Sequence, residues 1–168
     1  EESLAELINK IRAKIPDVVI RTTFITGFPG ETEENFETLS RFINNVKFDR
    51  LGCFAYSPEE GTFASKMDNQ IDDEVKIHRS EIIMQQQYEI FSEKQESRVG
   101  TVMTAIVDGF DDENMLYMGR TYMDAPNVDG TVFVQSEEEL ISGDFVTVKI
   151  TNAKEYDLIG GVVYESAK

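Results

Sequence analysis

The chain has 168 residues, of which 32 are acidic and 16 are basic, and its formal net charge is −16. This charge repels phosphate backbones, so it disfavours a direct nucleic-acid partner and favours a basic protein surface. The single cysteine, Cys53, excludes an internal disulfide and any multi-cysteine metal or iron–sulfur site built from this chain alone. No apolar run approaches the roughly 20 residues of a membrane helix, so no membrane partner is predicted and a cytoplasmic location is expected.

Residues 1–57 alternate between helical and strand patterns. Apolar residues at helical spacing predict a helix over 3–14, and the β-branched run 18–26 predicts a strand covered on both faces. After a Gly/Pro turn, residues 32–46 predict a second amphipathic helix, and 50–57 predict a second strand that Pro58 ends. This α-β-α-β order predicts two parallel strands with helices packed on one face.

The remaining residues change in character along the chain. Residues 58–71 are interpreted as a loop, and 72–97 as a long helix whose apolar positions drift around its axis. From residue 99 onward, short strand patterns alternate with turn residues, which predicts a small antiparallel barrel. The expected strands are 101–107, 115–121, 131–134, 145–151 and 156–164. We therefore expect three parts, at 1–71, 72–98 and 99–168.

Two stretches are candidate binding sites. The turn from Gly27 to Glu31 follows a predicted strand, where exposed main-chain groups can hold a ligand, but its composition equally suits a tight strand-to-helix turn. It is not a P-loop, because no Lys-Ser/Thr pair follows the glycines. The second stretch crowds polar and aromatic groups around a Pro/Gly turn at Arg120, Tyr122, Asp124 and Asp129. It suits either a recognition loop at the barrel rim or a hydrogen-bonded turn.

Several of these motifs resemble a known family. Thr-Gly-Phe-Pro-Gly-Glu-Thr at 26–32 resembles the late-barrel motif of radical S-adenosylmethionine methylthiotransferases, and 99–168 resembles their TRAM domain. The segments 54–62 and 119–130 resemble the RimO branch, which methylthiolates the β-carbon of an aspartate in small-subunit ribosomal protein S-12. The resemblance implies an α/β plus all-β fold. It would comprise the last two strands of a radical-SAM partial (βα)6 barrel and a five-stranded antiparallel, OB-like TRAM barrel.

The resemblance also implies cofactors and site residues. The full-length enzyme would use S-adenosylmethionine and two [4Fe-4S] clusters. This chain lacks the cluster-binding cysteines, so it is expected to be a fragment that is inactive alone, binds no cofactor tightly, and carries no metal ligand or catalytic residue. The residues expected beside S-adenosylmethionine are Phe24, Ile25, Gly27, Phe28, Gly30 and Glu31, with Phe24 and Ile25 lining the barrel. Those expected at the substrate protein are Arg120, Tyr122, Asp124 and Asp129.

Charge supports a protein substrate independently of the resemblance. Residues 99–168 hold 13 acidic and 4 basic side chains, a net charge of −9, which would steer a basic ribosomal protein toward the barrel. Two alternatives remain open: a segment of the tRNA-modifying branch, and a non-catalytic protein-binding module. If the upstream barrel is absent, strand 18–26 has an unpaired edge, and homo-association through that edge is expected.

Overall fold

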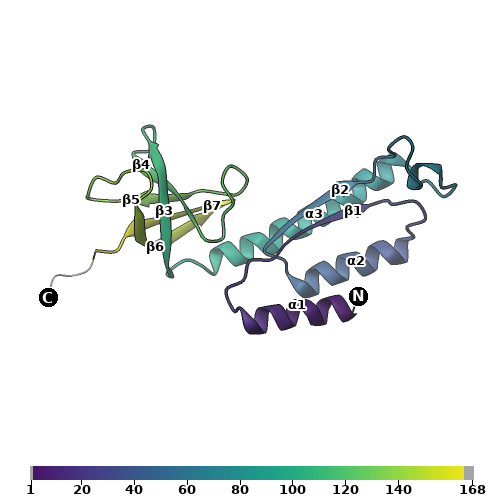
Figure 1. Cartoon of the computed structure of the whole chain (residues 1–168), viewed down its shortest axis with the longest axis horizontal. Helices are drawn as coiled ribbons and strands as arrows, with labels where there is room; N and C mark the ends of the chain where they lie inside the picture. The colour runs from purple at the N-terminus through teal and green to yellow at the C-terminus, as the bar shows by residue number, and fades with distance from the viewer. Residues whose placement is uncertain (1, 165–168) are drawn as a thin grey trace. The chain divides into compact units, whose positions relative to one another are not determined.

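The computed structural model describes residues 2–164 (Figure 1), and the chain divides into two units, Glu1–Phe91 and Ser92–Lys168. Residues 165–168, which belong to the predicted third part, lie outside the described residues. Within residues 2–164, no helix is long and apolar enough to cross a membrane.

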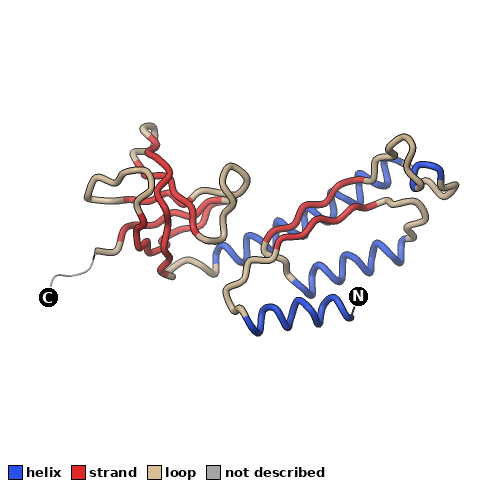
Figure 2. Tube along the Cα trace, in the orientation of Figure 1, coloured by secondary structure: helices blue, strands red, loops and turns tan. Residues whose placement is uncertain are grey.

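The first unit alternates helices and strands as the sequence predicts (Figure 2). Strands β1 (Arg21–Thr26) and β2 (Arg50–Ala55) pair in parallel over their whole length. The helices are α1 (Glu2–Lys14), α2 (Glu33–Val46) and α3 (Asp73–Glu96), with a 3-10 turn at Ala64–Lys66. The α-β-α-β order and the parallel pairing are thereby confirmed.

One apolar core joins the three helices to the sheet. Phe24 of β1 packs edge-on against Phe42 and Phe48, and the buried cluster takes residues from α1, α2, β2 and α3. Thr32 caps α2 through a reciprocal capping box with Asn35, which starts this helix directly after the Gly/Pro turn.

The expectation that the first strand is covered on both faces is wrong. The side chains of β1 alternate, and Ile25 is 54% exposed on the face opposite Phe24. Its neighbour in register on β2, Phe54, is 64% exposed. Among the described residues, the helices cover only one face of this two-stranded sheet, so the other face stays open.

The second unit is a closed five-stranded barrel with strand order β3-β4-β5-β7-β6. Buried valines, isoleucine, leucine and alanine of these strands fill its interior. The strands are β3 (Val102–Asp111), β4 (Leu116–Thr121), β5 (Val132–Gln135), β6 (Phe145–Lys154) and β7 (Asp157–Val162).

The barrel is mixed, which corrects the antiparallel prediction. Four of its neighbouring pairs are antiparallel, but β5 and β7 run parallel, with Val132 opposite Leu158 and Gln135 opposite Gly161. The reason is geometric: strand direction cannot alternate all the way around a closed ring with an odd number of strands. A five-stranded barrel therefore contains at least one parallel pair.

Candidate functional site

The turn after β1 depends on glycine at two positions. Gly27 has φ +73° and Gly30 has φ +88°, values that residues with a β-carbon rarely adopt. A β-carbon on Gly27 would lie 2.2 Å from Cγ of Lys76, whereas one on Gly30 would meet no atom within 4 Å. The Gly27 backbone is therefore pressed against α3, while the Gly30 side of the turn is open.

Glu31 closes the turn from its other end. One carboxylate oxygen, Oε1, accepts hydrogen bonds from the Gly27 amide at 3.0 Å and from Nη1 of Arg79 at 2.7 Å. Nη2 of Arg79 donates to Glu33 at 2.8 Å. Burial alone would lower the pKa of the Arg79 guanidinium, but its hydrogen bonds to Glu33 and Glu31 outweigh burial and raise that pKa. The Glu31 carboxylate therefore links the Gly27 end of the turn to Arg79 of α3.

A second set of contacts holds the end of β1. The Tyr56 amide donates to the Thr26 carbonyl at 2.8 Å, and the Thr26 hydroxyl donates to the Lys76 carbonyl at 3.2 Å. The rings of Phe28 and Tyr56 meet edge to face at 5.4 Å, and the Lys76 ammonium lies 5.6 Å from the centre of the Tyr56 ring. The turn is therefore a rigid platform fixed to β2 and α3.

The open face of the sheet continues this platform. Ile25, Phe28 and Phe54 are all about half exposed or more, and Gly52, which pairs with Thr23 two positions before Phe54, has no side chain of its own. A β-carbon on Gly52 would meet only the Phe54 ring, at 3.6 Å. Phe24, by contrast, packs in the core, because alternation directs it away from Ile25.

The sequence interpretation missed Lys76 and Arg79, which α3 brings to this turn. Their side chains are only 4% and 9% exposed. One signal was available: with Ile83, Gln87 and Ile90 they follow the spacing of one helix face, and all five are buried. The apolar residues of this helix do not mark the buried face, since Val75, Met84 and Tyr88 are each about 40% exposed.

Two of the four residues proposed at the barrel rim influence each other: the hydrogen bonds to Asp108, and more weakly the charge of Asp124, raise the pKa of Arg120. Arg120 pairs with Asp108 through two hydrogen bonds of 2.6 and 2.8 Å, and the hydrogen bonds from Arg120 lower the Asp108 pKa. Asp124 accepts from the amide and hydroxyl of Thr121, at 3.0 and 2.7 Å.

Asp129 closes the same loop by accepting from the Ala125 amide at 2.7 Å. Tyr122, in contrast, is 65% exposed. The two aspartates therefore shape a rim loop that presents Tyr122.

Residues 2–164 contain no candidate metal site, because no group of three or more His, Cys, Asp or Glu side chains is placed to hold an ion. Cys53 is buried in the core, and burial raises the pKa of its thiol. The thiol is therefore kept protonated, as expected for a small core residue.

Comparison with known proteins finds similar sequences for both units. The TRAM domain profile matches residues 99–163. The ribosomal protein uS12 methylthiotransferase RimO of Lachnoclostridium phytofermentans is 51% identical over 159 residues, which are 95% of this chain and 36% of that protein. Its namesakes from Acetivibrio thermocellus and Vibrio vulnificus are both 46% identical, over 99% and 96% of this chain and 37% and 34% of their own lengths. Almost the whole chain is therefore similar to part of the RimO methylthiotransferases; it spans about a third of those relatives' length and contains a TRAM domain at residues 99–163.

Proposed function

We propose that the chain is part of an enzyme that methylthiolates the β-carbon of an aspartate in ribosomal protein uS12, acting in the cytoplasm. The observation that carries this proposal is the 51% identity to a uS12 methylthiotransferase over 95% of the chain. The first unit would supply the last two strands of a radical-SAM partial barrel, and residues 72–98 would link it to the TRAM domain. The two parallel strands, each with a helix preceding it, suit that role.

S-adenosylmethionine fits the open face of the first unit. Ile25 and Phe54, which are partners in register, offer exposed apolar surface to an adenosyl group, and the Phe54 ring lies beside Gly52, which has no side chain of its own. Main-chain groups of the turn 27–30 lie at the carboxyl end of β1, where α/β sheets bind ligands. When bound, S-adenosylmethionine supplies the methyl group and the radical chemistry, while these residues bind and orient it.

The iron–sulfur clusters do not fit this chain. A [4Fe-4S] cluster is held by several cysteine thiolates, whereas the sequence has one cysteine and burial keeps its thiol protonated. Cluster ligands would therefore have to come from outside these 168 residues.

The TRAM domain is proposed to recognise the substrate protein. Its residues 99–168 carry 13 acidic and 4 basic side chains, which attract a basic ribosomal protein and repel RNA phosphates. The same charge disfavours the alternative of a tRNA substrate. The first unit also disfavours the alternative of a non-catalytic protein-binding module. Its strand pair has an open apolar face, which a ligand or further chain would cover.

A chimeric enzyme tests the proposal. The 168 residues would replace the matched third of the Lachnoclostridium phytofermentans relative, and the products would be analysed by mass spectrometry. We expect a methylthiolated aspartate in uS12. A methylthio group found on tRNA instead, or an inactive chimera that folds and binds S-adenosylmethionine, would contradict the proposal.

A further inference from the structure

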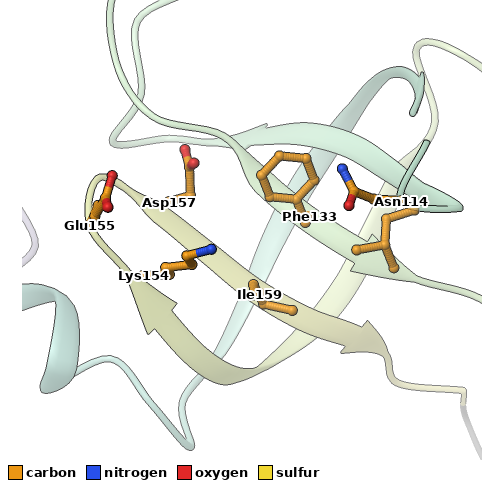
Figure 3. Close-up of a pocket in the computed structure, with 7 residues that line it drawn as sticks. Asn114, Phe133, Lys154, Glu155, Asp157 and Ile159 are labelled. Carbon is orange, nitrogen blue, oxygen red and sulfur yellow. The ribbon is translucent and has the colours of Figure 1, made fainter. Parts of the chain in front are cut away.

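A pocket of about 340 Å³ lies on the outer surface of the barrel in the second unit (Figure 3). Its floor is apolar and comes from three neighbouring strands, β4, β5 and β7. Phe133 lies opposite Ile159 in register, and Leu116 comes from the start of β4. Phe133 points outward because its neighbours Val132 and Val134 fill the barrel interior. The floor thus combines an aromatic ring with aliphatic surface.

Polar groups from two turns form the rim. Figure 3 shows Asn114 on one side of the Phe133 ring and Asp157 on the other. One carboxylate oxygen of Asp157 accepts a hydrogen bond from the Thr131 amide at 2.7 Å, so the carboxylate is held in place at the pocket. Glu155 lies beside it at the tip of the β6–β7 turn, where φ is +51°. The pocket therefore presents an ordered carboxylate close to an aromatic ring.

We infer that this pocket binds the cationic side chain of an arginine or lysine from a basic protein segment. The inference rests on the proposed function and names the surface on which that substrate would be read. Such side chains carry an apolar stem and a charged head, and the stem can lie over Leu116 and Ile159. The head then meets the face of Phe133 and the carboxylate of Asp157, combining a cation–π contact with an ion pair.

Charge around the pocket supports a cationic ligand. The end of β3 and the turn after it contribute Asp111, Asp112 and Glu113 next to Asn114, and the net charge of the barrel sequence is −9. A nucleobase could also stack on an aromatic ring, but its phosphates would meet this acidic surface. One group has the opposite sign: Lys154 also lines the pocket.

Substitutions at Lys154 and Asp157 can show whether the ligand is positively or negatively charged. Lys154 repels a cationic ligand, so Lys154→Gln is expected to tighten binding of a basic protein, whereas Asp157→Asn is expected to weaken it by about two- to fivefold. The asparagine oxygen can still accept from the Thr131 amide, so the turn is preserved. Phe133→Leu removes the ring and is expected to weaken binding by a similar factor. Glu138→Gln removes a charge of the same domain outside the pocket and serves as the matched control.

Two titrations of the 168-residue chain test the inference. In the first, N-acetylarginine amide is added to the isotope-labelled chain, and we expect amide shifts at Phe133 and Asp157 that Asp157→Asn reduces. Shifts elsewhere would overturn the pocket assignment. The assignment would also be overturned if adenosine monophosphate bound the pocket instead and its binding became weaker in the Lys154→Gln variant.

In the second, purified uS12 is titrated into the wild type and each variant by calorimetry. Weaker binding with Asp157→Asn and tighter binding with Lys154→Gln would support the inference, and equal affinity for all variants would overturn it. If uS12 does not bind the wild type while N-acetylarginine amide still binds the pocket, the proposed substrate fails and the pocket assignment stands.

Discussion

Replacing Arg79 with methionine tests whether the turn after β1 depends on a buried cation. The guanidinium side chain is 9% exposed, lies over the Phe36 ring at 5.3 Å, and joins Glu31 and Glu33 to α3. Methionine keeps most of the apolar volume but removes the charge and every donor. Glu31, whose side chain is 13% exposed, then retains only the Gly27 amide among the hydrogen bonds given above.

The expected loss of stability follows from the separate contacts. The charge-assisted hydrogen bond to Glu31 contributes about 1.5–3 kcal/mol. The contact with Glu33 contributes about 0.5 kcal/mol, because that carboxylate is 70% exposed, and the cation–π contact with Phe36 adds about 0.5–1 kcal/mol. One gain opposes these losses: Nε of Arg79 is buried with no hydrogen-bond partner within residues 2–164, and the substitution removes it. Removing this unpartnered donor returns about 1 kcal/mol, so the net destabilisation is about 1.5–3.5 kcal/mol.

Urea unfolding followed by the helical circular dichroism signal measures this loss, since most helical residues lie in the first unit. Arg41→Met is the matched control, because Arg41 pairs with Glu37 at 3.9 Å on the surface with both side chains at least 60% exposed. That variant is expected to lose less than about 0.5 kcal/mol. Equal unfolding midpoints for the two variants would refute the reasoning. A double-mutant cycle with Glu31→Gln should return a coupling of at least about 1 kcal/mol.

Three further substitutions have defined outcomes. Gly27→Ala should destabilise the chain by about 3 kcal/mol or more in urea, because its β-carbon would strike α3, whereas Gly30→Ala should cost about 1 kcal/mol from φ alone; equal losses would contradict this. Arg120→Met should raise the pKa of Asp108 toward its ordinary value in an NMR titration; because the wild-type pKa is lowered, this pair stabilises the fold at neutral pH and loses its effect as pH falls below about 4. A pKa unchanged by the substitution would show that the pair has no such role. The chain should self-associate with rising concentration in light scattering through the edge of β1, and Thr23→Lys should suppress this; a monomer at every concentration would disprove edge pairing.

Local patterns predicted most elements because each element is encoded by its own residues. The capping pair at Thr32 and the β-branched run before Gly27 suffice to place α2 and β1 to within a few residues. The barrel strands follow from turn residues that recur between short apolar runs. What local patterns could not show was strand direction, since β5–β7 pairing joins segments separated by a whole strand.

Long-range contacts also decide the candidate site. Lys76 and Arg79 are 45 or more residues from the turn they hold, so their roles depend on how α3 packs. Gly160 shows a subtler limit. The register shift opposite this glycine lies in β6, between Ile150 and Asn152, and a β-carbon on Gly160 would come 2.5 Å from the Lys149 carbonyl oxygen. A glycine within a strand indicates that another backbone segment approaches closely, but the sequence does not show which segment it is.

The parallel pair gives an unusual role to the acidic segment 136–144. Strands β5 and β6 are consecutive but not adjacent, so this segment must carry the chain across the barrel before β7 can close it. Two tyrosines tether it: the hydroxyl of Tyr164 accepts from the Glu137 amide at 2.9 Å, and that of Tyr117 from the Leu140 amide at 3.1 Å. Surface loops usually tolerate shortening. Here the length of an exposed, charged loop sets the span of the crossing, so losing residues from it would open the ring.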